Sequence, residues 1–142
     1  MNTVSENKFL SLTEEFPDSI INPFLIVHSM NVDQISGKTI QGNGTLKFVE
    51  VVISESSNFE HISCILEFFN CTFETNFQLK ENHRISGVTT LKDGITLEID
   101  TCLAERKVIQ GNGKVVLSGR IQNMRKFKHI KCEKCLSNIT FG

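Results

Sequence analysis

The sequence predicts an all-β protein: a short parallel β-helix, or solenoid, with a small helical cap at its N-terminal end. The first observation is an internal duplication, in which three segments return in the same order 68 or 69 residues later. The pairs are Lys38–Gly44 with Lys107–Gly113, Phe59–Cys64 with Phe127–Cys132, and Asn70–Phe73 with Asn138–Phe141. The second observation is that Val, Ile, Thr and Phe alternate with polar residues between Gly and Asn turns. Repetition of this kind is typical of solenoids and of folds built by duplication.

A finer period supports the solenoid. Five copies of a short pattern, Ile then a polar residue then Gly or Cys, are spaced by 22, 23, 24 and 21 residues. They begin at Ile40, Ile62, Ile85, Ile109 and Ile130. Because side chains alternate along a strand, the Ile and the small residue two positions on share one face. We therefore expect Ile to stack on Ile inside the solenoid, and Gly or Cys to stack on Gly or Cys.

The N-terminal part differs from the rest. Ser11–Glu14 fits a capping box that opens a short helix, and Pro17 ends it. Phe24–Val27 is typical of a buried strand. We interpret residues 1–30 as a cap segment and residues 31–142 as one β-repeat domain, with duplicated units at about 38–74 and 107–142.

The repeated segments resemble those of a known family. Lys38–Gly44 and the two Asn-x-x-Phe units, Asn70–Phe73 and Asn138–Phe141, resemble repeats of right-handed parallel β-helices of the pectin-lyase-like kind. The resemblance covers roughly residues 35–142 and implies stacked parallel strands. The polysaccharide-cleaving members of that family are much longer. No matching cluster of carboxylates and arginine occurs here, so the resemblance implies no catalytic residue.

A second fold explains part of the pattern. Asn43-Gly44 and Asn112-Gly113 are strong signals for two-residue hairpins when apolar residues flank them. An antiparallel β-barrel or sandwich built by internal duplication is therefore the alternative. In such a barrel, four aromatic residues would line an interior that binds or converts an apolar small ligand. These residues are Phe48, Phe68, Phe73 and Phe77.

Composition points to a single cytoplasmic domain. The chain has 142 residues, of which 39% are hydrophobic, and 11 Phe supply all its aromatic side chains. We find no signal-peptide pattern and no apolar run long enough to span a bilayer. Five Cys are an odd number without framework spacing, which favours reduced thiols in the cytoplasm over a disulfide scaffold.

The sequence shows no catalytic constellation, and we expect neither an enzyme nor a cofactor. Cys132 and Cys135 have half of a zinc-knuckle spacing, but residues three apart on a strand face opposite ways. They are secondary candidates for a metal site. His61 and His129 are equivalent in the repeat, and each lies three residues before a Cys. The same facing argument makes them structural residues rather than partners of a cysteine nucleophile.

The charge distribution supplies the candidate function. Residues 1–79 contain three basic and ten acidic residues, whereas residues 106–134 contain nine basic residues and one acidic residue. The predicted binding segment is Arg120, Arg125, Lys126, Phe127, Lys128, Lys131 and Lys134. A net charge of −1 and the absence of Trp and Tyr argue against a dedicated nucleic-acid binder. We expect a non-enzymatic protein that binds a protein partner, as an inhibitor or immunity protein does, or that self-associates.

Overall fold

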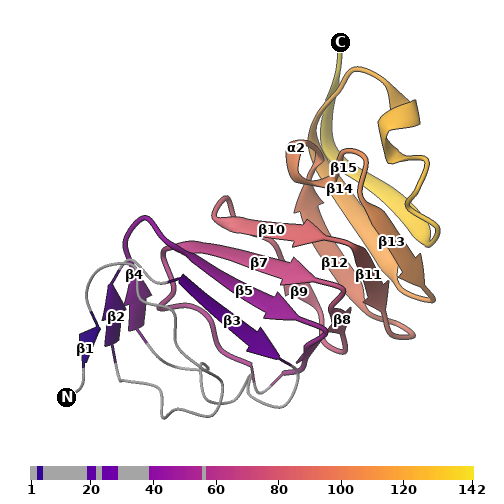
Figure 1. Ribbon diagram of the computed structural model, residues 1–142. Helices are drawn as coiled ribbons and strands as arrows, with labels where there is room; N and C mark the ends of the chain where they lie inside the picture. Colours follow the sequence, from indigo (N-terminus) through magenta and orange to yellow (C-terminus); the bar gives the residue numbers. More distant parts are fainter. Residues whose placement is uncertain (1–2, 5–18, 22–23, 29–38, 56) are drawn as a thin grey trace.

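The computed structural model describes residues 3–4, 19–21, 24–28, 39–55 and 57–142, and these form a β-solenoid (Figure 1). Every strand pair in these ranges is parallel, and paired residues lie 16 to 22 positions apart, from Thr3 with Ser19 to Ile40 with Ile62. The predicted all-β solenoid is therefore confirmed. The antiparallel barrel or sandwich is wrong. The helix predicted at residues 11–17 lies outside the described residues.

The described strands form four parallel sheets. The first contains β1 (Thr3–Val4), β2 (Ser19–Ile21) and β4 (Thr39–Gln41). The second contains β3 (Phe24–His28), β5 (Thr45–Val49), β7 (Ile65–Phe69) and β10 (His83–Ser86). The third contains β6 (Val52–Ile53), β8 (Thr72–Phe73), β11 (Val88–Leu91) and β13 (Val108–Gly111). The fourth contains β9 (Phe77–Gln78), β12 (Thr96–Asp100), β14 (Lys114–Ile121) and β15 (Glu133–Phe141).

Two short helical turns interrupt the later turns of the solenoid. The helix α2 (Thr101–Ala104) follows β12, and Asp100 caps it by accepting a hydrogen bond from the Cys102 N–H at 2.9 Å. The 3₁₀ helix η2 (Met124–Phe127) follows β14 and is capped in the same way by Asn123, which accepts from the Arg125 N–H. In the described part of the chain, no helix is long and apolar enough to cross a membrane.

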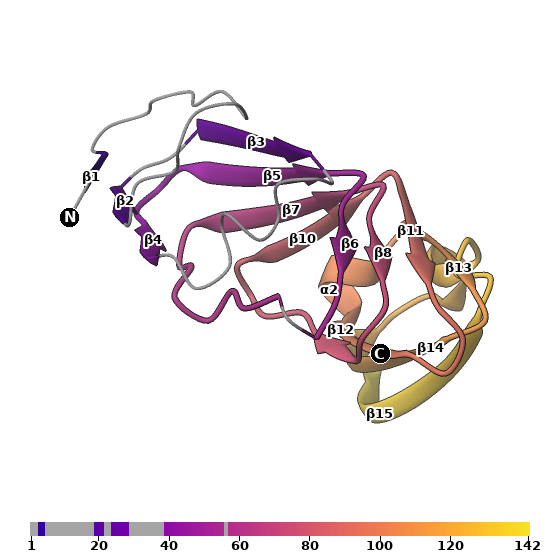
Figure 2. The ribbon, with the colours of Figure 1, turned by 90° about the horizontal axis from the view of Figure 1, so that it is seen from below.

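The sheets succeed one another along the solenoid instead of running its whole length. Figure 2 shows the strands of the second sheet side by side, with the third and fourth sheets following toward the C-terminus. The first sheet ends with an isolated bridge at Ile62, and the fourth begins only at β9, at Phe77. Consecutive turns of the chain therefore occupy partly different sheets.

Because the sheets succeed one another in this way, the predicted stacking of the five Ile on one another is wrong in part. Ile40 pairs with Ile62 in the first sheet, and Ile109 pairs with Ile130 in the third. Ile85 lies in the second sheet, where it pairs with Phe68. The five Ile are all buried, as expected, but they form two separate pairs and one isolated member. The expected stack of small residues is also incomplete, because Cys64 is buried whereas Gly42 and Gly111 are exposed.

The duplication marks equivalent corners. The first Gly-Asn-Gly segment connects β4 in the first sheet with β5 in the second, and the other connects β13 in the third sheet with β14 in the fourth. Gly42 and Gly111 have φ values of 107° and 109°. Asn70 and Asn138 are equivalent in the repeat too, and their φ values are 53° and 54°. Both motifs therefore contain left-handed backbone: Gly42, Gly111 and Asn70 lie where the chain passes from one sheet to the next, and Asn138 lies within β15 beside its register shift from β14.

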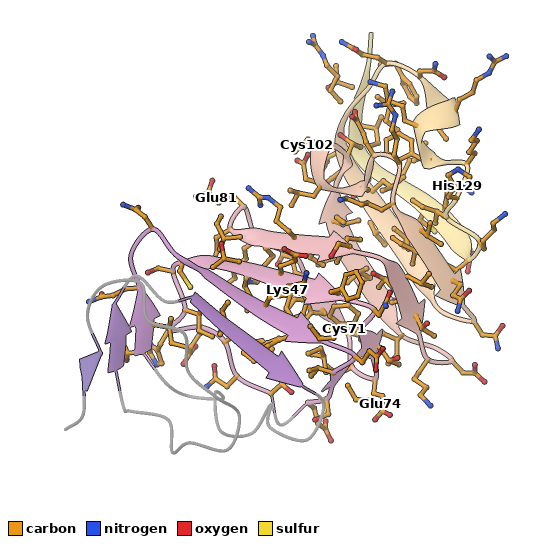
Figure 3. All side chains as sticks on the ribbon, viewed as in Figure 1. Lys47, Cys71, Glu74, Glu81, Cys102 and His129 are labelled. Carbon is orange, nitrogen blue, oxygen red and sulfur yellow. The ribbon has the colours of Figure 1, made fainter. Side chains whose placement is uncertain are left out.

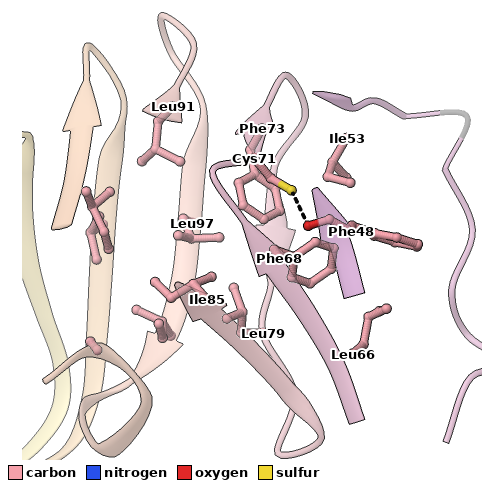
Figure 4. Packing of buried hydrophobic residues seen from close by; sticks show 14 of the residues in the cluster. Phe48, Ile53, Leu66, Phe68, Cys71, Phe73, Leu79, Ile85, Leu91 and Leu97 are labelled. Atoms are coloured by element: carbon pink, nitrogen blue, oxygen red, sulfur yellow. Dashed lines mark hydrogen bonds between the residues drawn. The ribbon is translucent and has the colours of Figure 1, made fainter. Parts of the chain in front are cut away.

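Phenylalanine fills the interior. Phe48, Phe68 and Phe73 are completely buried, and the ring centroid of Phe68 lies 5.5 to 5.7 Å from those of Phe48, Phe73 and Phe77. Figure 4 shows Phe48, Phe68 and Phe73 together with Cys71, whose thiol donates a hydrogen bond to the Phe48 carbonyl oxygen at 3.5 Å. The four Phe predicted to line a hollow barrel pack against one another instead.

Candidate binding surface at the C-terminal end of the solenoid

The last strand, β15, forms the edge of the fourth sheet. It pairs with β14 on one side, and no described strand pairs with its other side. An edge of this kind presents backbone N–H and C=O groups that can accept a further strand. Figure 1 shows β15 (yellow) at the end of the molecule opposite to β1 and β2.

The apolar residues of β15 that pair with buried core residues of β14 are exposed. In parallel pairing, partners in register point to the same face, and Leu136 pairs with Leu117 while Phe141 pairs with Ile121. Leu117 and Ile121 are 0% and 2% exposed, whereas Leu136 and Phe141 are 47% and 65% exposed. The apolar core is therefore exposed at this end of the described residues.

A lysine lies in the same layer. Lys134 pairs with the buried Val115, so its side chain also starts on the core face. Its ammonium group donates a hydrogen bond to the Ile130 carbonyl oxygen at 3.1 Å. The aliphatic stem thus lies along the open core, while the charge is kept at its edge.

The predicted basic segment is divided by the fold. Arg120 is near the end of β14, whereas Arg125 and Lys126 lie in η2 and Lys128 directly follows it. Lys131 lies just before β15, and Lys134 within it. These cations are exposed, except that Lys126 is partly buried. The structure places Phe127 in the core at 1% exposure, so it anchors η2 and is removed from the surface set.

A hollow of about 430 Å³ lies beside η2. Its walls are Arg106, Asn123, Arg125, Lys126, Lys128 and His129. Two main-chain hydrogen bonds join the segments that form it: Arg106 N–H donates to the Lys126 carbonyl at 2.6 Å, and Ile109 N–H to the His129 carbonyl at 3.2 Å. Figure 3 shows His129 pointing outward on this side of the molecule. Sequence reasoning missed Arg106, because it is 19 residues before Arg125 and lies at the turn after α2.

The structure brings no further metal-binding side chains of the described residues to Cys132 and Cys135. Cys132 and Cys135 are partly buried free thiols, and Cys132 packs against the core. Burial raises the pKa of the Cys132 thiol, which disfavours the thiolate that zinc requires. Among the residues that the structure describes, no three His, Cys, Asp or Glu side chains form a group that could hold a metal ion.

The two repeat-equivalent histidines are on the surface, and a third histidine is inside. His61 and His129 are exposed, and His61 Nε2 lies 3.3 Å from Glu60 Oε1. His83 is 4% exposed, and its Nδ1 accepts a hydrogen bond from the Lys80 N–H at 3.0 Å. Burial, assisted by the charges of Lys80 and Arg84, lowers the pKa of His83 to about 4. His83 is therefore a neutral core residue at physiological pH.

A second hollow, of about 490 Å³, lies between β10, β12 and α2. Two of its charged side chains, Arg84 and Asp100, are hydrogen-bonded to the backbone of the protein. The Arg84 guanidinium donates to the carbonyl oxygens of Glu81 and His83, at 2.5 and 2.8 Å, and Asp100 caps α2. Its walls carry both signs of charge, so it offers less selectivity than the hollow beside η2.

Comparisons with protein-family models, with curated proteins and with solved structures found no match to this chain.

Proposed function

We propose that this is a non-enzymatic protein that binds a protein partner at the open end of its solenoid. The partner is an extended segment that carries acidic side chains and adds to the free edge of β15. The observation that carries the proposal is the exposure of Leu136 and Phe141, at 47% and 65%, in register with fully buried core positions of the preceding turn. Strand addition of this kind is a common mode of peptide recognition.

The apolar layer supplies the binding energy. Covering a Leu or Phe side chain contributes about 1.5–3 kcal/mol when it is fully buried. Leu136 and Phe141 are 47% and 65% exposed, so the remaining gain is about 1–2 kcal/mol each. The backbone hydrogen bonds along β15 fix the position of the added strand, and alternate side chains select its sequence.

The charges around β15 select an acidic partner. Arg120, Lys131 and Lys134 are exposed within or next to the last two strands, and Glu133 is the single acidic residue in the range 106–134. Opposite charges raise the association rate and reject wrong partners. A second copy joined through β15 would bring the same cations against each other, so the charge favours a different protein over self-association.

We also propose a cellular location, a structural kinship and a form of protein binding. Cytoplasmic location is supported by five cysteines that are all free, of which Cys64 and Cys71 are deeply buried. Kinship with pectin-lyase-like β-helices is supported by the parallel pairing and by the left-handed Asn70 and Asn138 of the Asn-x-x-Phe units. An inhibitor or immunity role is the form of protein binding that the small size and polarised charge favour.

A displayed library of random twelve-residue peptides tests the binding surface. The proposal expects enriched peptides that alternate apolar and acidic residues and that lose at least tenfold in affinity for Leu136→Asp. Val88→Asp is the matched control, because Val88 is an exposed apolar residue, at 39%, on the third sheet. Peptides without acidic enrichment, or with equal affinity for Leu136→Asp and the native protein, would refute the proposed surface.

Light scattering on the same variants separates a foreign partner from a second copy. We expect the native protein to be monomeric at low and at high salt. A native dimer that Leu136→Asp dissociates and Val88→Asp does not would replace the acidic partner with a second copy of this chain.

A further inference from the structure

The hollow beside η2 is rigidly built, although its walls come from two separate segments. Arg106 follows α2, whereas Asn123, Arg125, Lys126, Lys128 and His129 belong to η2 and its flanks. The backbone hydrogen bond from Arg106 N–H to the Lys126 carbonyl, at 2.6 Å, ties the two segments directly. Phe127, at 1% exposure, anchors η2 in the core between the cationic residues on either side. The cationic side chains therefore start from fixed backbone positions.

The positive charge of this hollow is largely uncompensated. The Lys126 ammonium group lies 3.6 Å from the Glu105 carboxylate. Among the described residues, this is the one ion pair made by a cation of the hollow. Arg106, Arg125 and Lys128 have no carboxylate within 4 Å in the described part of the chain. Like charges gathered around a concave surface focus a positive potential, which raises the local concentration of anions.

The donor set favours phosphate groups. The guanidinium groups of Arg106 and Arg125 each offer paired N–H donors that match the geometry of phosphate oxygens, and Lys126 and Lys128 add point charges. Asn123 accepts from the Arg125 N–H through its Oδ1, which leaves its amide NH₂ group as a further neutral donor. A volume of about 430 Å³ exceeds what one phosphate fills. Arg106, Arg125 and Lys128 are not paired with a carboxylate of the described residues, so together they are suited to a ligand with several negative charges.

We propose that the hollow beside η2 binds a small molecule that carries two or more linked phosphate groups. This inference goes beyond the proposed function. It uses none of Lys134, Leu136 and Phe141, so a ligand in the hollow is compatible with a strand added to β15. It is also separate from the Gly-Asn-Gly segments, which are corners between strands and not phosphate-binding loops.

Isothermal titration calorimetry with inorganic pyrophosphate on the native protein tests the inference. We expect saturable binding of one pyrophosphate per chain, weakened by salt because the contacts are charged. Orthophosphate should bind at least tenfold more weakly, because it can engage fewer of the cations. Absence of saturable pyrophosphate binding, or equal affinity for orthophosphate, would overturn the proposal.

Charge-removing variants locate the site. Arg125→Gln and Lys128→Gln each remove an exposed cation of the hollow and should weaken pyrophosphate binding about tenfold, the equivalent of one charge-assisted contact. Lys92→Gln is the matched control, since Lys92 is an exposed cation on another part of the solenoid. If Lys92→Gln weakens binding as much as Arg125→Gln does, the attraction is diffuse and the site is refuted.

Two measurements keep this test distinct from that of the proposed function. Leu136→Asp should leave pyrophosphate affinity unchanged, and Arg125→Gln should leave the affinity of selected peptides within about threefold. Amide NMR shifts on pyrophosphate addition should centre on residues 105–107 and 123–129. Shifts centred on β15 would overturn the assignment to the hollow.

Discussion

Replacement of Gly111 by alanine should destabilise the protein strongly, because Gly111 lies directly against the backbone of the neighbouring strand β11. Gly111 ends β13, has a φ of +109°, and pairs with Leu91 of β11. A Cβ atom added there would overlap the Leu91 carbonyl oxygen and lie 3.0 Å from its carbonyl carbon and amide nitrogen. These are main-chain atoms, so no side-chain rotation can relieve the overlap.

The magnitude follows from two contributions. Left-handed backbone costs a non-glycine residue about 1–2 kcal/mol. Separating β11 from β13 to accommodate the methyl group would also weaken neighbouring ladder hydrogen bonds, each worth about 1 kcal/mol. We therefore expect Gly111→Ala to lower the free energy of unfolding by about 3–4 kcal/mol.

Gly94→Ala isolates the first contribution, the cost of left-handed backbone. Gly94 has a φ of +76°, and a Cβ atom added to it would have nothing within 4 Å. Its expected loss is about 1–2 kcal/mol, which is the backbone term alone. Chemical denaturation measures both losses in the free energy of unfolding, provided that the slope of this free energy against denaturant concentration is the same for the two variants. If Gly111→Ala is no less stable than Gly94→Ala, the close approach of the strands is not as described.

Three further predictions concern the core. Phe68→Ala should cost about 3–5 kcal/mol in chemical denaturation, whereas Phe141→Ala, at 65% exposure, should cost less than about 1 kcal/mol in the free protein; equal losses would contradict the packing. His83 has a pKa of about 4 in the folded protein against 6.5 unfolded, so the unfolded chain binds its proton first as pH falls. Stability should therefore be full above pH 6.5 and should fall by about 3 kcal/mol at pH 4, and His83→Gln should remove that part of the pH dependence. Cys64 is buried, which raises its pKa to about 11, whereas Cys102 is exposed, so a thiol reagent at pH 8 should modify Cys102 before Cys64, as peptide mass spectrometry would show; faster modification of Cys64 would contradict its burial.

Repetition in the sequence predicted the fold class because a solenoid is made of like turns. Ile40, Ile62, Ile85, Ile109 and Ile130 are buried as expected, since each lies on the inward face of a strand or bridge. The spacing of the pattern counts residues per turn, but it does not say which sheet a turn enters. The succession of sheets along the stack, which separates Ile85 from the others, was therefore not predictable from the spacing.

The corners illustrate the same limit. Asn43-Gly44 and Asn112-Gly113 are compatible with a tight hairpin or with a corner between two parallel sheets. The structure shows the corner, in which the preceding Gly42 and Gly111 adopt positive φ. The difference depends on where the following strand finds its partner, and that partner is about 20 residues away in the chain.

The candidate surface was predictable only in its charge. The basic residues from Arg120 to Lys134 are conspicuous in the sequence, but burial of Phe127 depends on how η2 packs on the core. The hollow depends on the turn that brings Arg106 to η2, and the open core layer depends on the register of β15 with β14. Each of these is a contact between segments distant in sequence, for which the local pattern carries no signal.

The succession of sheets has a consequence for how the molecule comes apart. Because the first sheet ends at Ile62 and the fourth begins at β9, the first and last strands share no sheet and are coupled only through the second and third. Stability in such an array is close to a sum of terms between neighbouring turns. The C-terminal turns can therefore unzip while the turns around Phe48 and Phe68 remain folded, so β15 can exchange partners without global unfolding.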